Sequence, residues 1–223
     1  MLLVPLGIIL YTMIDFVFQN IKTFAELVLG GGLFLYLFEI YRKRREEKRL
    51  IKKLTKEVTF ELFAEEVVLS VNISRFNSLI QNPIGTTAMG RFSLIIIDAT
   101  LSSGYFINFE HKFNDFLFSI YTRFKNINFE IEQFMKLPDE YKGDNINLLQ
   151  SGKRHSMEAF ESLQSSKIFI DLRKKYLKEW LIKVRLDIDI LPEGVEVPQD
   201  DEILEFWAGL LKEKAGISEG RED

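Results

Sequence analysis

The sequence contains no cysteine and only two histidines, His111 and His155, among its 223 residues. Without cysteine the chain has no disulfide framework, thiolate nucleophile or cysteine-ligated metal site. His155 and Glu158 lie three residues apart, on one face of an expected helix, but a metal site there needs a further ligand from elsewhere. Nucleotide-binding, serine-hydrolase and kinase signatures are also missing. The sequence therefore predicts no metal, no cofactor and no catalytic residue.

Proline and glycine are absent between Arg42 and Gln81. Over this stretch apolar residues recur at intervals that fit one face of a helix, with Glu65 interrupting the stripe between Leu62 and Leu69. Because the residue before a proline avoids the α region, Asn82-Pro83 is expected to end the helix. The sequence predicts one long helix that continues from the apolar N-terminal region.

Two apolar blocks, Met1–Phe18 and Phe24–Tyr41, open the chain. A helix of about 18 residues is about 27 Å long, just enough for the hydrocarbon core of roughly 30 Å. We favour a hairpin in which both blocks cross the membrane and residues 19–23 form a tight turn. In the alternative, only the second block crosses. The first block lacks a cationic start, so a cleaved secretory signal is not expected.

A basic run follows the second apolar block without a linker. Residues 42–57 contain nine lysines or arginines and three glutamates. The cations expected at the membrane surface are Arg42, Lys43, Arg44, Arg45, Lys48 and Arg49. Lysine and arginine in short flanks resist transfer across a bilayer, which predicts an inner-membrane protein whose main domain is cytoplasmic. Residues 58–223 are net acidic, which argues against a nucleic-acid partner.

The acidic residues and the glycines within the apolar region each allow two interpretations of their role. Asp15, Glu26 and Glu39 fall near the predicted membrane boundaries, where water is close, rather than at mid-depth. Gly30, Gly31 and Gly32 permit close helix packing against the first block, against a second copy or against another membrane protein. In the other reading the glycines only make the span locally flexible.

The acidic part of the chain has the pattern of a helical bundle. Phe109–Leu137 is the clearest element, with apolar residues three or four apart, and is expected to run antiparallel to the first long helix. Residues 91–101 are expected to form a short helix, although Leu94–Ile97 also fits a buried strand. Ser102-Ser103-Gly104 supplies a stop.

The C-terminal third is expected to hold two more helices. A polar connection over 139–152 leads to a third long helix over 153–191, whose last residues, Leu186–Ile190, alternate like a strand. A final helix over 202–215 is expected to follow a cap at Asp200 or Asp201 and to end at Gly216.

Carboxylates are the remaining candidates for chemistry. They are Glu61, Glu65, Glu66, Asp98, Glu110, Asp115, Glu130 and Glu132. Paired carboxylates perform acid–base work when burial separates their pKa values, whereas on amphipathic helices most form the solvated face. Glu65 stands out because it lies on the apolar stripe.

The order of features resembles a loose group of uncharacterised prokaryotic membrane-anchored proteins. The resemblance rests on Tyr41–Leu54, on the turn Leu101–Gly104, and on Phe116–Asn128 with Tyr121 and Asn128. It covers about half of the chain and none of its motifs is specific. It implies a cytoplasmic helical bundle on a membrane stalk, and it brings no activity and no site residues.

Together these patterns predict a mainly α protein: an N-terminal transmembrane helix or helical hairpin followed by a bundle of long antiparallel helices. The expected parts are a membrane anchor over 1–41, a basic juxtamembrane helix over 42–57, the bundle over 58–216 and a flexible tail over 217–223. The expected function is that of a membrane-tethered interaction or sensor module. The alternative is a small subunit of a membrane transporter or channel.

Overall fold

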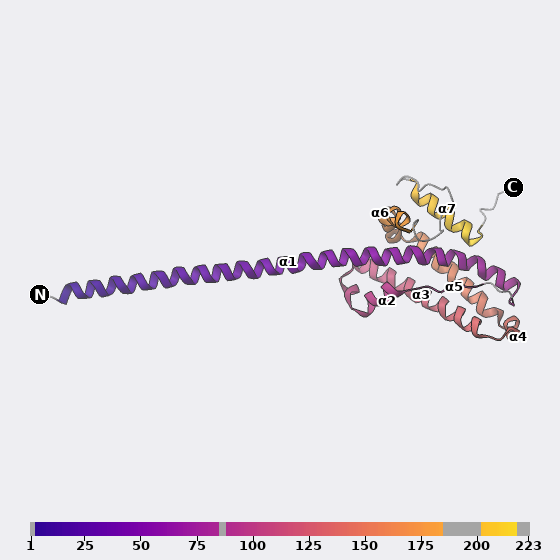
Figure 1. Cartoon of the computed structure of the whole chain (residues 1–223), viewed down its shortest axis with the longest axis horizontal. Helices are drawn as coiled ribbons and strands as arrows, with labels where there is room; N and C mark the ends of the chain where they lie inside the picture. The colour runs from indigo at the N-terminus through magenta and orange to yellow at the C-terminus, as the bar shows by residue number, and fades with distance from the viewer. Residues whose placement is uncertain (1–2, 85–87, 185–201, 218–223) are drawn as a thin grey trace. The chain divides into compact units, whose positions relative to one another are not determined.

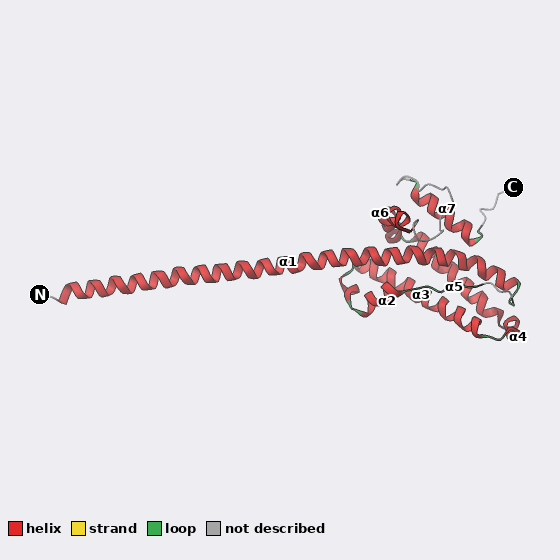
Figure 2. Ribbon diagram, in the orientation of Figure 1, coloured by secondary structure: helices red, strands yellow, loops and turns green. Residues whose placement is uncertain are grey.

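The computed structural model describes the backbone of residues 3–84, 88–184 and 202–217, and the side chains of these residues except 3–20 and 22–34. The described residues form helices and loops, with no strand among them (Figure 2). The strand-like segment Leu186–Ile190 lies outside the described residues. The chain divides into two units, Met1–Leu50 and Ile51–Asp223.

The first unit consists of the N-terminal part of helix α1, which runs from Leu3 to Gln81 (Figure 1). The backbone is helical through residues 19–23, so the predicted turn and the helical hairpin are wrong. No proline or glycine occurs in those five residues to stop the helix. In the part of the chain that the structure describes, no helix combines the length and the apolar character that crossing a bilayer requires.

The second unit starts with the C-terminal part of α1 and continues through shorter helices. These are α2 (Ile95–Ser102), η1 (Tyr105–Asn108), α3 (His111–Lys136), α4 (Asp139–Lys142), η2 (Gly143–Asn145), α5 (Ile146–Ser165), α6 (Lys167–Val184) and α7 (Ile203–Ala215). The short segment after Asn82-Pro83 is helical from Ile95, not a strand. Gly104 follows it with φ +75°, the left-handed conformation that favours glycine.

Helix α3 lies parallel to the C-terminal part of α1, not antiparallel as predicted. Residues 90–97 return along α1 in the reverse direction, since Asn72 contacts Gly90 and Glu61 contacts Ile97. α3 then reverses direction again, because its Tyr121 contacts Asp98 and its later Asn128 contacts the earlier Phe92. A chain that reverses twice is parallel to where it started (Figure 1). The return segment causes this difference, because its residues 91–94 are not helical although the sequence predicted a helix from residue 91.

The core of the second unit is built from the predicted apolar stripes. α3 buries seven residues spaced three or four apart: Phe113, Leu117, Ile120, Phe124, Ile127, Ile131 and Phe134. α1 contributes Leu62, Phe63, Leu69, Ile73 and Phe76 among others. Phe92 from the return segment stacks on Phe124 with ring centroids 4.4 Å apart. The clearest predicted element is therefore confirmed in position and in its buried face.

The predicted polar connection over 139–152 and single helix over 153–191 are both wrong. α5 already begins at Ile146, and the chain breaks between α5 and α6 at Ser166. Ser166 precedes α6, and its Oγ accepts the backbone N–H of Phe169 at 3.4 Å, the arrangement of a helix N-cap. After this break α6 buries Phe169, Arg173, Tyr176 and Trp180, whereas Ile168 and Leu172 are half-buried.

The final helix is confirmed at Ile203–Ala215 and ends at Gly216, whose φ is +66°. The expected capping residues Asp200 and Asp201 lie outside the described residues. Trp207 of α7 is buried and meets Trp180 of α6 edge to face, with ring centroids 5.6 Å apart. Trp180 also meets Phe63 of α1, with ring centroids 5.7 Å apart, and so joins the C-terminal helices to the core of the second unit.

Candidate functional site

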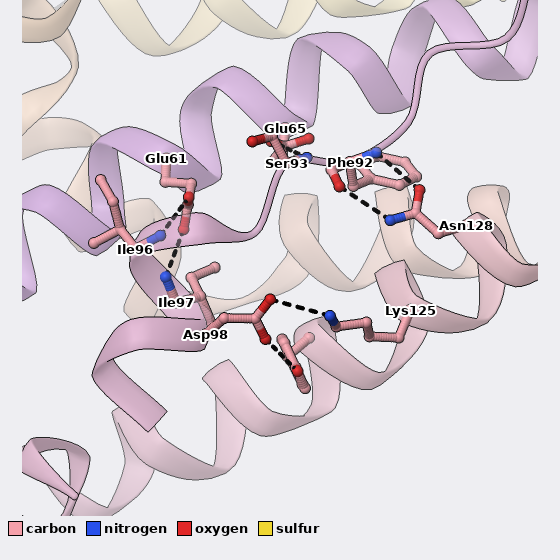
Figure 3. Close-up of polar contacts among 10 residues, drawn as sticks. Glu61, Glu65, Phe92, Ser93, Ile96, Ile97, Asp98, Lys125 and Asn128 are labelled. Carbon is pink, nitrogen blue, oxygen red and sulfur yellow. Dashed lines mark hydrogen bonds and ion pairs between the residues drawn. The ribbon is translucent and has the colours of Figure 1, made fainter. Parts of the chain in front are cut away.

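The most unusual feature of the second unit is a row of three glutamates on α1. Glu65 and Glu66 are 4% and 0% exposed, and Glu61 is half-buried. Glu61 and Glu65 are one helical turn apart and point to the same side, toward the return segment (Figure 3). Glu66 instead contacts α5, α6 and α7. The carboxylates therefore hold segments on two different sides of α1.

Glu61 closes the N-terminus of α2. Its two carboxylate oxygens accept the backbone N–H groups of Ile96 at 2.8 Å and Ile97 at 2.7 Å. Leu94, at the N-cap position of α2, has an apolar side chain that cannot accept these N–H groups. A carboxylate from another helix thus satisfies free amides and lies at the positive end of the α2 dipole. Burial raises the pKa of Glu61, and these two N–H groups oppose that change.

Glu65 accepts one hydrogen bond, from the backbone N–H of Ser93 at 2.9 Å. Its second oxygen, Oε2, is buried and has no hydrogen-bond partner. Burial raises the pKa of Glu65 to about 8, and the charge of Glu61 acts in the same direction. At neutral pH the carboxyl group is therefore mostly protonated.

Two asparagines also form hydrogen bonds with the backbone of the return segment. Asn72 of α1 donates to the carbonyl of Gly90 at 2.6 Å and accepts its N–H at 2.9 Å. Asn128 of α3 forms the same pair of bonds with Phe92, at 3.0 and 2.8 Å (Figure 3). Each amide thus substitutes for a backbone partner that an extended segment would otherwise find in a sheet.

Asp98 ties α2 to α3. Its carboxylate accepts a hydrogen bond from the hydroxyl of Tyr121 and pairs with Lys125 at 3.1 Å (Figure 3). Burial tends to raise the pKa of Asp98, but these two donors lower it below its usual value. Tyr121 of α3 therefore holds α2, and Asn128 of the same helix holds the return segment.

Glu66 forms the second, opposite network. It accepts hydrogen bonds from Gln164 at 2.9 Å, from Trp207 Nε1 at 2.9 Å and from Arg173. The guanidinium of Arg173 lies over the ring of Phe169, 4.5 Å from its centroid. Burial raises the pKa of Glu66, and Arg173 and Trp207 act against that change. One carboxylate therefore connects α1 to three later helices.

Sequence reasoning identified Glu65 but missed the Glu66 network. A signal was present, because Glu66 lies three residues from both Phe63 and Leu69, which are buried. Arg173 likewise falls within a run that buries Phe169 and Tyr176. When the buried face of one helix carries an acidic residue and that of another carries a basic residue, a buried ion pair is predicted. The geometry of the Glu66–Arg173 pair also depends on the break at Ser166.

The other candidate carboxylates lie in separate contacts. Glu130 accepts a hydrogen bond from Ser151 at 2.6 Å and lies 3.1 Å from His155 Nδ1. Glu158 pairs with Arg123 at 2.9 Å instead of joining His155. Asp115 and Glu132 form exposed pairs with His111 and Lys136, and Glu110 is exposed. Among the described residues no cluster of three potential metal ligands occurs.

The predicted membrane-surface residues belong to the first unit. Arg42, Lys43, Arg44, Arg45, Lys48 and Arg49 are all exposed on α1. Glu39 accepts two hydrogen bonds from Arg42, at 2.8 and 3.0 Å. Gly30, Gly31 and Gly32 lie within α1, and the side chains of Asp15 and Glu26 are outside the described set.

Comparison with protein-family models, curated protein sequences and solved structures finds no match.

Chemically, the Glu61–Glu65 pair is a proton-linked contact. Both side chains accept N–H groups of residues 93–97, and Glu65 holds a proton near neutral pH. Deprotonation leaves a charge on a buried oxygen without a donor, which is unfavourable. The arrangement can therefore couple pH to how tightly the return segment is held against α1.

Proposed function

We propose that this chain is a membrane-tethered helical interaction or sensor module. In this proposal residues 1–41 attach to a lipid bilayer of the inner membrane, and the second unit forms its cytoplasmic domain. The observation that carries the proposal is the exposure of every basic side chain from Arg42 to Arg49 on α1, directly after the apolar sequence of residues 24–41.

The charge of this run fits an anionic membrane surface. A lysine or arginine near such a surface contributes roughly 1 kcal/mol of attraction. Arg42 pairs with Glu39 and Glu46, and Lys43 with Glu39, so part of the charge is neutralised within α1. No ion pair among the described residues involves Arg44, Arg45 or Lys48, which leaves these cations available to lipid phosphates.

A partner-binding role is supported by apolar side chains that the second unit leaves in solvent. Ile95 is 70% exposed and Ile107 is 72% exposed. Tyr105 and Phe118 are also exposed, and η1 contacts both α2 and α3. Exposed apolar side chains on adjoining elements are typical of interaction surfaces. The partner in this proposal is a membrane protein or a second copy of the chain.

Membrane attachment is tested by fractionation of cells that express the full chain. The chain should stay in the membrane pellet after an alkaline carbonate wash, because apolar residues, not charge alone, hold it. Replacing Arg44, Arg45 and Lys48 by glutamate should disturb insertion or orientation, whereas replacing Arg154, Lys174 and Lys214, outside the basic run, by glutamate should not. Recovery of the wild-type chain in the soluble fraction contradicts the proposal.

Partner binding is tested by a photo-crosslinking residue at Ile107 in the full chain. The expected result is a reproducible product with one membrane protein or with the chain itself. The same residue placed at Glu140, which is exposed on α4, serves as the control. If repeated extractions with the anchor intact yield no product above that control, the interaction role is wrong.

A further inference from the structure

A pocket of about 680 Å³ opens at the first residues of the second unit. Its apolar lining comes from α1, α3, α6 and the residue that follows η1, and consists of Ile51, Phe109, Phe113, Ile168 and Leu172. Phe109 and Phe113 are buried, whereas Ile51, Ile168 and Leu172 are half-buried. The volume lies within the range of about 300–1,000 Å³ that is usual for small-ligand sites.

Cations surround this apolar lining. Lys112, Lys167 and Lys175 line the pocket and are exposed. No described ion pair involves any of the three, although Lys175 lies over the ring of Tyr176. Two carboxylates, Glu110 and Asp171, also line the pocket. Lysines therefore outnumber carboxylates by one at its rim.

Backbone amides add to the positive character. The first intrahelical bond of α3 runs from Asn114 N to Glu110 O, and that of α6 from Ile170 N to Ser166 O. The amides of Lys112 and Lys167 precede these bonds and have no intrahelical acceptor. Two helices of 26 and 18 residues thus begin at one pocket, and each places the positive end of its dipole there.

We propose that this pocket binds the phosphodiester headgroup of an anionic glycerophospholipid, with the glycerol and upper acyl carbons on the apolar lining. The lysines and helix N-termini match the phosphate, and a soluble inorganic anion would leave the five apolar side chains unused. The inference rests on the proposed function, which supplies the membrane, and it names what the module would sense there. Ile51 follows Arg49 by two residues, so this site lies close in sequence to the basic run.

The test uses the full chain in a mild non-ionic detergent, with bound lipid counted by native mass spectrometry. The probes are phosphatidylglycerol, phosphatidylcholine, inorganic phosphate and octanoate. We expect wild type to retain one phosphatidylglycerol in preference to phosphatidylcholine. Replacing Lys112, Lys167 and Lys175 by glutamine should weaken this binding about tenfold, because small effects of single charges multiply over three contacts.

A matched variant removes the same charge elsewhere. Arg154→Gln with Lys174→Gln and Lys214→Gln leaves the pocket and the basic run intact and should bind phosphatidylglycerol like wild type. Leu172→Asn should weaken phosphatidylglycerol binding without changing the charge. Circular dichroism melting of each variant verifies that it is folded, and a variant that melts early is replaced by the single Lys167→Gln or Lys175→Gln.

Three outcomes overturn the inference. If the matched variant loses as much phosphatidylglycerol binding as the pocket variant, the attraction is nonspecific. If inorganic phosphate at the same concentration displaces phosphatidylglycerol, the pocket is a site for soluble anions. If the wild-type chain binds octanoate in preference to phosphatidylglycerol, the pocket is a fatty-acid site. Carbonate washing separates this inference from the proposed function. A pocket variant that stays in the membrane but binds lipid like wild type contradicts the pocket alone, whereas a wild-type chain lost from the membrane contradicts the tether.

Discussion

Replacing Glu65 by glutamine isolates the free energy linked to its buried carboxyl group. The pKa of Glu65 is raised from 4.5 to about 8 because the group is buried. The folded chain therefore holds a proton that the unfolded chain releases between these two values. The stability linked to this proton is fully present below the lower value and is lost as the pH rises through the higher one.

The size of the effect follows from the two pKa values. Between pH 4.5 and about pH 8, each rise of one pH unit lowers the free energy of unfolding by about 1.4 kcal/mol. Over the whole interval the loss is at most about 5 kcal/mol. From pH 5 to pH 8 the expected loss is at most about 3.5 kcal/mol, because titration is incomplete near each end. The Ser93 N–H favours the charged form, and the pKa of about 8 already includes this opposing effect.

Glutamine keeps an oxygen for the Ser93 N–H and cannot titrate. Its amide places unpaired N–H groups near the position of Oε2, which costs about 1–3 kcal/mol at every pH. The informative quantity is therefore the pH dependence of the difference between Glu65→Gln and wild type. That difference should shift in favour of the variant by up to about 3.5 kcal/mol between pH 5 and pH 8.

Urea unfolding of the full chain in mild detergent measures this difference. Both tryptophans, Trp180 and Trp207, are buried in the second unit, so their fluorescence reports on its unfolding. Glu140→Gln, on the exposed α4, is the matched control and should give a flat difference. A flat difference for Glu65→Gln as well would show that Glu65 is ionised in the folded chain, and the proton-linked contact would be refuted.

Two further substitutions test the packing of the second unit. Arg173→Met should lower the free energy of unfolding by about 3–5 kcal/mol because Glu66 loses its buried cation, and the double variant with Glu66→Leu should lose less than Arg173→Met alone. An additive double variant in the same urea assay would contradict the buried pair. Gly152→Ala should cost about 1–3 kcal/mol, since a Cβ there would lie 2.7 Å from the Phe76 ring. Gly143→Ala, which has open space, is its control, and equal melting temperatures for the two would contradict the close packing.

Local sequence patterns predicted the helices of this chain well where one apolar period ran unbroken. The α3 stripe from Phe113 to Phe134 and the end of α1 at Gln81 are examples. The break at Ser166 was missed because apolar residues continue on both sides of it, and only the side-chain cap distinguishes the two helices. Local pattern cannot reveal such a cap when the flanking sequence is itself helical.

The direction of α3 and the Glu66 network depended on tertiary contacts. The sequence predicted a helix from residue 91, yet Asn72, Asn128 and Glu65 hold residues 90–93 outside any helix, and this return segment reverses the chain once more. Glu65 was identifiable because it interrupted an apolar stripe. The hydrogen-bond partner of Glu65, the backbone N–H of Ser93, could not be identified from the sequence, because every residue except proline has such a group.

Membrane attachment with a cytoplasmic second unit is the central claim, and cysteine labelling tests it most directly. The chain has no cysteine, so Lys174→Cys on α6 introduces a single thiol at an exposed position. Spheroplasts that express this variant are treated with a membrane-impermeant maleimide before or after permeabilisation. We expect the protein in the membrane pellet and labelling only after permeabilisation. Labelling of intact spheroplasts, or recovery of the chain in the soluble fraction, would contradict the account.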